Sequence, residues 1–463
     1  MAGYEHILRT LGALVWGPHT VLLMLGVGIY LTLRLRFLQV RGMPLALRLV
    51  AGRSDFGEGS AERSGDITPW QALATSLAAT IGNGNIAGVC TAIAMGGPGA
   101  VFWMWVSAFF GMATKIVEAV LGQRFRTLAP DGTVAGGPMY YISRGLGMPW
   151  LAGTFAFFMG GKALFATTTV QSNSIAIAMW TQLGIPLWVS GLGLALLVWA
   201  SIIGGIRSIA RVTVILSPLM VILYLGGALV TVALFMGQVP EALRLIFVGA
   251  FSPRAVGGGV AGATLATAMR YGFARGAYSN EAGTGTAAVF HAAARTSEPV
   301  RQGLIASLDV FIDTMVVCTL TALAVLVTGV WTAGTSTEMT VNAFNTALPG
   351  IGGLVVAASS LLFGLSSLIA NPYYGEISYA YLFGFRIRVP FRWIFCGMVL
   401  LGAVLRVEVA WSIGDIFNGM MAFTNLIGVL GLSWLAVSAI RTYMEGMRTS
   451  SPPSPGPGAG IVS

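Results

Sequence analysis

Long apolar segments recur along the whole 463-residue chain, and they limit what it can fold into. A run such as VTVILSPLMVILYLGGALVTVALF, at residues 212–235, is long enough to cross the roughly 30 Å hydrocarbon core of a bilayer as a helix. Only 9% of the residues are charged, whereas about 25% is typical of soluble domains. We find none of the alternating segments of about ten residues that indicate a β-barrel. The chain is therefore predicted to be an all-α integral membrane protein.

Apolar runs and helix-breaking residues together predict eleven transmembrane helices, and the first is interpreted as a span because no signal-peptide cleavage site follows it. The expected spans cover residues 15–34, 70–94, 101–123, 151–182, 185–203, 212–236, 258–282, 302–328, 352–372, 391–405 and 412–440. Of the 24 arginines, eighteen fall in loops on one side and four on the other. Positively charged loops stay in the cytoplasm, so the N-terminus is predicted outside and the C-terminus inside. The strong excess of arginine over lysine is typical of a GC-rich bacterial gene. We therefore expect a multi-pass protein of the bacterial cytoplasmic (inner) membrane.

Two of the expected spans are interrupted. The second contains TIGNGN at residues 80–85, and the seventh contains RYG at 270–272 among several small residues. Interrupted helices in corresponding positions of two halves predict an inverted-repeat transporter with its site near the membrane midplane. The expected organisation is an N-terminal helix and linker (1–69), two five-helix repeats (70–236 and 258–440) and a disordered cytoplasmic tail (441–463).

Four stretches of the sequence are similar to signature blocks of the alanine or glycine:cation symporter family. They are GNGNIAGVCTAIAMGGPGAVFWMWVSAFFGMATKIVE at 82–118, GGPMYYI at 136–142, RYGFARGAYSNEAGTGTAAVFHAAARTSEPVRQG at 270–303 and YYGE at 373–376. The resemblance covers residues 16–441 and implies a LeuT-type fold, an inverted repeat of five plus five helices with one extra N-terminal helix. It also implies Na⁺-coupled symport of alanine or glycine into the cell by alternating access, with Na⁺ as the coupling ion.

An amino acid substrate carries a carboxylate and an ammonium group, and the first interrupted span suits both charges. Gly82 and Gly84 permit an unwound turn, whose freed peptide groups and helix end bind charge. Asn83 and Asn85 offer amide donors and acceptors, although Asn85 is equally interpreted as a repair of the unwound backbone. The full set of expected substrate-binding residues is Thr80, Gly82, Asn83, Gly84, Asn85, Thr168, Gln171, Asn173, Thr267 and Asn371.

Adjacent hydroxyls in the ninth span suggest the cation site. In the LeuT-type fold that the resemblance implies, Ser366 and Ser367 complete a Na⁺ site with the carbonyls of Ala78 and Ile81. The alternative is that each serine only bonds back to a carbonyl of its own helix.

The ninth span departs from the family pattern just before YYGE. Asn371, between Ala370 and Pro372, stands where the family is expected to have a tryptophan that walls the substrate pocket. If Asn371 faces the site, a larger or more polar amino acid such as glutamine or serine becomes the alternative substrate. If Pro372 turns the asparagine away, the pocket is unchanged.

Lys162 lies within an expected span and has two interpretations. An intramembrane ammonium group is a functional candidate, here as a substitute for Na⁺ or as a proton-coupling group. The alternative is that Lys162 extends to the cytoplasmic interface. Coupling to H⁺ is therefore retained as an alternative to coupling to Na⁺.

Other charged residues are expected to form pairs. Lys115 and Glu118 are three residues apart on one helix face and are predicted to pair. Glu281 and Glu376 are predicted to form an inner gate with arginines such as Arg275. Asp309 and Asp313 share a helix face. We expect them either to form part of an ion or proton path or to make an ion pair with Arg270.

Other functional classes lack the residues that they need. Cys90, Cys318 and Cys396 are widely separated and are expected to pack as small apolar residues. The sequence has three histidines and neither an HExxH motif nor a P-loop, so no enzyme or ATP-driven pump is predicted. A channel would show repeated pore loops or charged rings. The expected partners are an amino acid, a cation and the lipid bilayer, with no nucleic acid and no obligate protein partner.

Overall fold

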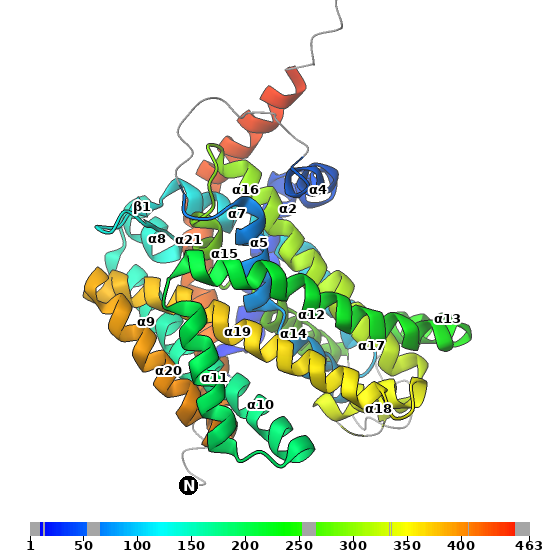
Figure 1. Cartoon of the computed structure of the whole chain (residues 1–463). Coiled ribbons are helices and arrows are strands. Elements are labelled where there is room, and N and C mark those ends of the chain that lie inside the picture. Colours follow the sequence, from blue (N-terminus) through cyan, green and yellow to red (C-terminus); the bar gives the residue numbers. More distant parts are fainter. Residues whose placement is uncertain are drawn as a thin grey trace, which may run out of the picture.

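The structure is a computed structural model that describes residues 10–12, 14–52, 65–251, 265–332, 334, 336–405 and 407–449. Helices make up most of it, and a short antiparallel hairpin pairs Thr127 with Ala135 and Leu128 with Val134 (Figure 1). The elements are α2 (Pro18–Arg34), α3 (Leu38–Arg41), α4 (Met43–Val50), α5 (Pro69–Thr80), η1 (Gly84–Gly88), α6 (Val89–Gly96), α7 (Ala100–Arg124), β1 (Thr127–Leu128), β2 (Val134–Ala135), α8 (Pro138–Gly145), α9 (Pro149–Gly161), η2 (Lys162–Thr167), α10 (Thr168–Leu183), α11 (Leu187–Ile202), α12 (Ile206–Leu234), η3 (Met236–Gln238), α13 (Val239–Phe251), α14 (Leu265–Asn280), α15 (Thr286–Ala292), α16 (Pro299–Val310), η4 (Phe311–Cys318), α17 (Thr319–Val327), η5 (Val330–Thr332), α18 (Ser336–Ala347), α19 (Gly352–Phe383), η6 (Phe385–Ile387), α20 (Arg388–Val404) and α21 (Val407–Thr449).

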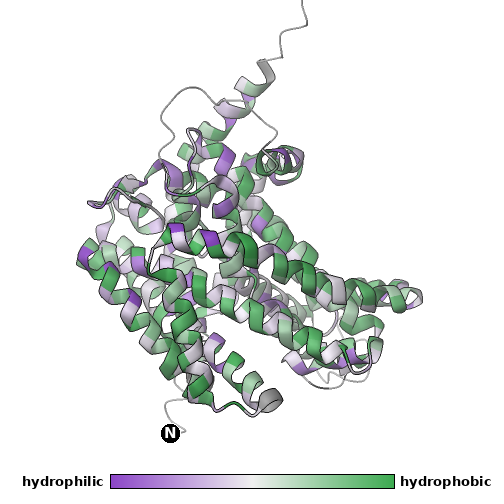
Figure 2. Cartoon of the chain, viewed as in Figure 1, coloured by the Kyte–Doolittle hydropathy of each residue, from purple (hydrophilic) through white to green (hydrophobic). Residues whose placement is uncertain are grey.

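The described residues form six helices that are long and apolar enough to cross a membrane, or seven if the bent pair α5–α6 is one span. α2 and α11 are shorter apolar helices. The count of eleven spans and the five-plus-five repeat therefore stay predictions. Figure 2 shows hydrophobic residues along the long helices, whereas hydrophilic residues gather at the end of the molecule that carries the β-hairpin. We call this end the hairpin end.

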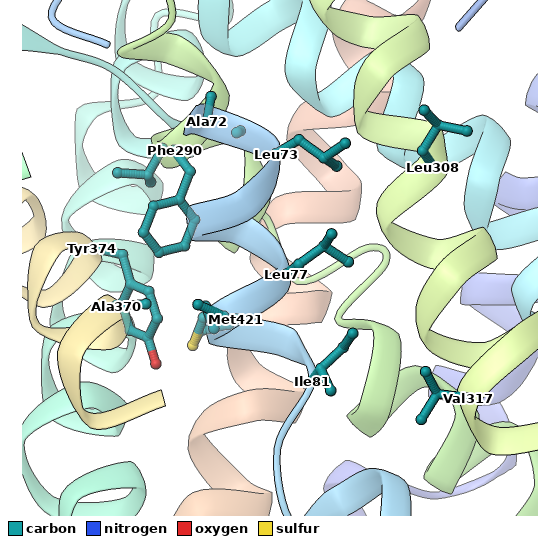
Figure 3. Packing of buried hydrophobic residues seen from close by; sticks show 14 of the residues in the cluster. Ala72, Leu73, Leu77, Ile81, Phe290, Leu308, Val317, Ala370, Tyr374 and Met421 are labelled. Atoms are coloured by element: carbon teal, nitrogen blue, oxygen red, sulfur yellow. The ribbon is translucent and has the colours of Figure 1, made fainter. Parts of the chain in front are cut away.

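The first predicted interruption is confirmed. α5 begins with a capping box, in which the Thr68 hydroxyl and the Gln71 amide each bond the other's backbone amide, and Pro69 occupies the first turn. Figure 3 shows Leu73, Leu77 and Ile81 following one face of α5 to the point where its ribbon unwinds. The chain resumes as η1 and α6, at an angle of 56° to α5.

The second interruption lies elsewhere than predicted. Arg270–Gly272 is part of the continuous helix α14, and the break comes at residues 281–285, before α15. Gly283 and Gly285 have φ angles of +87° and +83°, which glycine adopts without strain, so the chain turns there. Gly272 is small for a different reason. A Cβ atom at this position would lie 2.4 Å from a backbone oxygen of α7, so the glycine allows two helices to touch.

The C-terminal boundary also differs from the prediction. α21 continues to Thr449, so residues 441–449 are helical and not part of a disordered tail. The rest of the expected tail, residues 450–463, lies outside the described residues, as do residues 258–264 of the expected seventh span.

We predict that Gly272→Ala destabilises the protein by about 1–3 kcal/mol, because the added methyl group overpacks the contact between α14 and α7. Gly226→Ala is the matched control, since a Cβ atom at this exposed position in α12 meets nothing within 4 Å. Thermal unfolding of both purified variants in one detergent is the measurement. Equal unfolding midpoints would contradict the close contact.

Candidate substrate and cation site

Two adjacent serines of α19 meet the end of α5 inside the molecule. The hydroxyls of Ser366 and Ser367 lie 3.2 and 3.4 Å from the carbonyl oxygen of Ala78, to which each donates. Each hydroxyl also reaches the carbonyl of Phe363 in its own helix, at 2.9 and 3.0 Å. Both contacts expected from the sequence are therefore present: each serine bonds a carbonyl of its own helix, and each also contacts the first broken helix. All of these residues are buried.

Ile81 and Gly84 lie in the break itself. Ile81 is fully buried and its amide still donates to the carbonyl of Leu77, so the helical hydrogen bonding ends here. Gly84 begins η1, and a Cβ atom there would lie 3.6 Å from the ring of Tyr278 in α14. The two broken helices therefore approach each other beside Gly84.

Asn83 links the break to two other helices. Its amide nitrogen donates to Gln171 Oε1 of α10 at 2.9 Å, and its amide oxygen accepts from the Ser360 hydroxyl of α19 at 2.6 Å. Gly82 lies between the same helices, because its Cβ would meet the Ser367 hydroxyl at 3.1 Å and Gln171 Nε2 at 3.4 Å. The structure thus brings together Gly82, Asn83 and Gln171, as the sequence predicts for a substrate site.

Asn85 replaces hydrogen bonds that the break removes. Its side-chain oxygen accepts from the amide of Gly82 at 3.0 Å, and its nitrogen donates to Asp313 Oδ1 at 2.6 Å. Asp313 also accepts from the hydroxyls of Ser279 and Thr314, at 2.9 and 2.7 Å. Asn85 therefore has the structural role that the sequence left open.

Asp309 joins the first broken helix to a buried lysine. It accepts from the hydroxyls of Ser76 at 2.5 Å and Thr80 at 3.0 Å, so the Thr80 side chain is directed to this carboxylate. Lys115 Nζ lies 3.2 Å from Asp309 Oδ2, and both side chains are fully buried. The same ammonium group donates to the carbonyl oxygen of Asn280, the last residue of α14, at 2.8 Å.

The predicted pair of Lys115 with Glu118 does not form a direct ion pair, although the two charges interact. Glu118 instead accepts from Asn425 Nδ2 of α21 at 2.5 Å, while Lys115 reaches the second break. The alternative pair of Asp309 with Arg270 is also wrong, because the buried Asp309 pairs with Lys115 whereas Arg270 is exposed. Spacing on one helix predicts surface pairs, but a buried charge takes the partner that the neighbouring helices offer.

Lys162 is buried and paired, so the interpretation that it extends to the membrane interface is wrong. Its Nζ lies 2.5 Å from Glu281 Oε1, and the two side chains are 7% and 8% exposed. The ammonium group also donates to Asn418 Oδ1 at 3.1 Å and lies 5.9 Å from the ring centre of Tyr374. Thr286 donates to the second oxygen of Glu281 at 2.7 Å. The pair connects η2 to the second break.

Arg275 is the partner of neither predicted gate residue. Glu281 pairs with lysine, and Glu376 accepts from Arg388 Nε at 2.5 Å and Arg392 Nε at 2.6 Å. Glu376 does bind arginines, but they come from α20. Two arginines therefore neutralise one buried carboxylate at the hairpin end.

The hairpin contributes Asp131 to the same cluster. Its Oδ2 lies 2.7 Å from Arg388 Nη1. Burial raises the pKa of the Asp131 carboxyl, but hydrogen bonds from Thr133 and the charge of Arg388 outweigh burial, and the pKa falls below its usual value. The hairpin carboxylate therefore stays ionised at neutral pH.

Asn371 is buried with an unpaired oxygen. The residue is 3% exposed, and its Oδ1 has no hydrogen-bond partner among the described residues. α19 continues as one helix through Pro372, so Asn371 lies one turn after Ser367 on the same face. A buried acceptor without a donor costs free energy unless a ligand or water supplies the donor.

Three expected substrate residues lie apart from this group. The Thr168 hydroxyl donates to carbonyls of its own helical segment. Asn173 donates to backbone oxygens at the end of α20, including that of Leu405 at 2.9 Å. Thr267 lies near the beginning of α14, where its carbonyl oxygen is 3.4 Å from a Cβ built on Gly96.

Ser360 and Asn418 are contacts that the sequence did not reveal. Ser360 precedes Ser367 by seven residues, and this spacing places both hydroxyls on one helix face. The spacing alone could therefore have predicted that Ser360 faces the site. Asn418 lies in an apolar span, where an amide indicates a buried partner without identifying Lys162.

The two breaks differ chemically. The first presents carbonyl, hydroxyl and amide groups, which bind a cation or a zwitterion without carrying charge themselves. The second is bonded to two ammonium groups, those of Lys115 and Lys162.

Comparison with known proteins identifies the family. The profile of the sodium:alanine symporter family matches residues 1–454. The sodium/alanine symporter AgcS of Methanococcus maripaludis is 42% identical over 452 residues, which cover 96% of this chain and 98% of AgcS. The probable sodium/glutamine symporter GlnT of Bacillus subtilis is 36% identical over 474 residues, covering 97% and 92% of the two chains.

A solved structure supports the fold. MhsT in complex with L-phenylalanine is only 14% identical, but it aligns with a TM-score of 0.56 over 83% of this chain and 99% of its own. The broken helices are therefore those of a LeuT-type transporter fold, and the match along nearly the whole sequence decides the family. This chain belongs to the sodium:alanine symporter family.

Proposed function

We propose that this protein carries a small neutral amino acid of the alanine or glycine type into the cell together with Na⁺. The observation that carries the proposal is the meeting of the Ser366 and Ser367 hydroxyls with the carbonyl oxygen of Ala78, where α5 ends. These oxygens are neutral, buried and come from two helices. Na⁺ is transported with the substrate and is not a permanent cofactor.

The spacing of these oxygens suits a hard cation. Oxygens that bind one ion at about 2.4 Å, a distance typical of Ca²⁺, lie about 3.4 Å apart when they meet it at right angles. The two serine hydroxyls lie 3.2 and 3.4 Å from the carbonyl of Ala78. Rotation of the hydroxyl hydrogens toward Phe363 leaves lone pairs for the ion. We propose that the carbonyl of Ile81 completes the site.

The amino acid would bind next to this ion. The regular hydrogen bonding of α5 is interrupted at residues 82–84, and the side-chain amides of Asn83 and Gln171 lie beside this break. Freed peptide groups and amides replace the water that hydrates the substrate's charges. Thr80 and Asn85 support the same backbone from behind through Asp309 and Asp313.

We propose that transport proceeds by alternating access, with the hairpin end in the cytoplasm. The arginine distribution supports an external N-terminus and a cytoplasmic C-terminus. The two broken helices would begin the repeats 70–236 and 258–440. The Lys162–Glu281 pair joins the second break to η2, so relative movement of these elements separates two buried charges.

A more polar substrate, such as glutamine or serine, is the second candidate. The unpaired Oδ1 of Asn371 favours it, since an amide or hydroxyl group of the substrate supplies the missing donor. A relative named as a probable sodium/glutamine symporter covers the same length of chain.

Uptake into proteoliposomes tests the function directly. The purified protein is reconstituted, and entry of labelled alanine, glycine and glutamine is measured under an imposed Na⁺ gradient, an imposed H⁺ gradient or neither. We expect accumulation with the Na⁺ gradient. Accumulation driven by the H⁺ gradient alone would show that the coupling ion is H⁺ and not Na⁺. Uptake that depends on neither gradient would reject coupled symport.

The double substitution Ser366→Ala and Ser367→Ala should weaken Na⁺-driven uptake. It removes two of the proposed ligands, so the Na⁺ concentration for half-maximal uptake should rise at least about tenfold. Ser201→Ala is the matched control, because its exposed hydroxyl only bonds the carbonyl of Leu197 in its own helix. Unchanged Na⁺ dependence in a folded double variant would exclude this site.

Replacement of Asn371 tests the substrate side chain. If the amide binds a polar substrate, Asn371→Leu should weaken competition by glutamine at least about tenfold while alanine uptake is retained. The measurement is inhibition of labelled alanine uptake by a panel of unlabelled amino acids. A wild-type protein that accepts only alanine and glycine would remove the second candidate.

Lys162→Met and Glu281→Gln should each destabilise the protein by about 3–5 kcal/mol, because each leaves an unpaired buried charge. The double variant should lose less than the sum of the single losses. Thermal unfolding and uptake are measured for all three. Arg244→Met, which breaks an exposed pair with Glu241, should change neither. Additive losses in the double variant would show that the two charges are not coupled.

A further inference from the structure

An amphipathic segment follows the first apolar helix. α3 and α4 continue each other through Gly42, whose amide donates to the carbonyl of Leu38 at 2.7 Å and whose carbonyl accepts from the amide of Ala46 at 2.8 Å. The side that includes Leu38, Ala46 and Leu49 is buried. A Cβ atom at Gly42 would lie 2.8 Å from the side chain of Leu304, so this side packs against α16. Figure 1 shows α4 at the hairpin end of the molecule.

The opposite side carries an apolar stripe beside a basic one. At about 100° of rotation for each helical residue, Val40, Pro44 and Leu47 fall within about 60° of one another. Arg41 and Arg48 are seven residues apart in the sequence, so they lie within about 20° of each other, next to the apolar stripe. All five residues are exposed, Val40 by 53% and Leu47 by 57%. We call these five residues the α3–α4 face.

The described part of the chain does not neutralise the charge of this face. Residues 6–54 contain neither aspartate nor glutamate. Among the described residues, no ion pair involves Arg41 or Arg48. Arg41 donates to the carbonyl of Leu35 at 3.5 Å, which leaves its charge uncompensated. α21 brings a further cation close, because Arg441 donates to the carbonyl of Arg34 at 3.4 Å.

The α3–α4 face lies where a membrane surface is expected. α2 ends at Arg34, which is also the predicted end of the first span on the cytoplasmic side. Arg36 and Phe37 then adopt φ angles of +54° and +59°, which side chains with a Cβ atom rarely adopt. This turn places Phe37, which is 46% exposed, at the start of the apolar stripe. Exposed apolar residues beside arginines are typical of helices that lie in the membrane interface.

We propose that the α3–α4 face binds an anionic phospholipid of the cytoplasmic leaflet. Arg41 and Arg48 bind the lipid phosphate, and the apolar stripe contacts the acyl chains. Guanidinium groups bind phosphate through paired hydrogen bonds, and basic residues next to a membrane span attract anionic lipid. A zwitterionic lipid has the same chains without net charge and is the weaker ligand. A second copy of this face would instead bring arginine against arginine.

Lipid binding to the purified full-length protein tests the proposal. The protein is freed of native lipid in detergent, and phosphatidylglycerol or phosphatidylcholine is added in equal amounts. Native mass spectrometry counts the bound lipid, and thermal unfolding measures stabilisation, because a ligand of the folded state raises the unfolding midpoint. Phosphatidylglycerol should bind at least about tenfold more tightly than phosphatidylcholine, and high salt should reduce the difference. Inorganic phosphate at the same concentration should stabilise the protein less than phosphatidylglycerol does.

Two variants test the two stripes separately. Arg41→Gln combined with Arg48→Gln should weaken phosphatidylglycerol binding at least about tenfold and leave phosphatidylcholine binding unchanged. Arg211→Gln combined with Arg386→Gln is the matched control, because it removes two exposed arginines from other loops on the same predicted side. Leu47→Asn keeps both charges and should also weaken phosphatidylglycerol binding. All the replaced residues are exposed, so the unfolding midpoints without lipid should equal that of wild type.

The outcomes decide the proposal independently of transport. Equal binding of the two lipids by wild type would overturn it, as would an unchanged lipid preference in the Arg41 and Arg48 double variant. Equal stabilisation by inorganic phosphate would assign the arginines to a free anion and overturn the lipid as ligand. Loss of the preference in the matched control would show a general effect of charge and overturn the α3–α4 face as the site. None of these measurements involves Na⁺-driven uptake, so the proposed function is tested separately.

Discussion

Peptide groups within a bilayer have no water to bond, so a membrane helix breaks only where side chains or a ligand take over its hydrogen bonds. Both breaks obey this constraint. At the first, Asn85 accepts from the amide of Gly82. At the second, the side chain of Asn280 accepts from the amide of Ala282, and its carbonyl is bonded by Lys115. Asn85 and Asn280 are therefore explained first by the backbone groups that they bond.

Buried charge is the second constraint, since an unpaired charge away from water is costly. Lys115 and Asp309 satisfy each other among α7, α16 and the first broken helix, where they hold neighbouring elements together. Lys162 and Glu281 instead connect the second break to η2 and, through Asn418, to α21. A movement of the second break relative to η2 changes the latter pair and leaves the former intact. The two ion pairs therefore connect different sets of elements.

The sequence predicts the parts that depend on local composition and fails where distant helices decide. The break at Gly82 is predictable, because glycines and amides in an apolar span contradict an ordinary helix. The contact of Ser366 with α5 follows from the family resemblance and appears in the structure. The predicted partner of Lys115 is wrong, and the sequence identifies no partner for Lys162, because spacing along one helix says nothing about which carboxylate a neighbouring helix presents. The second break was misplaced, because Gly272 serves helix packing and only its φ angle distinguishes such a glycine from a turn.

The two breaks resemble each other in shape but not in charge, and this asymmetry bears on where a mobile cation binds. At the second break, the carbonyl of Asn280 is bonded by the ammonium group of Lys115, and the carboxylate of Glu281 by that of Lys162. These two oxygen groups are therefore already occupied by cationic side chains, each of which is paired with a carboxylate. At the first break, the carbonyl of Ala78 meets only serine hydroxyls. Neutral oxygens can bind a cation and release it again. When the cation leaves, no buried carboxylate remains without a compensating charge. We propose that a transported cation therefore binds at the first break, beside the unwound backbone that binds the amino acid in the proposed function.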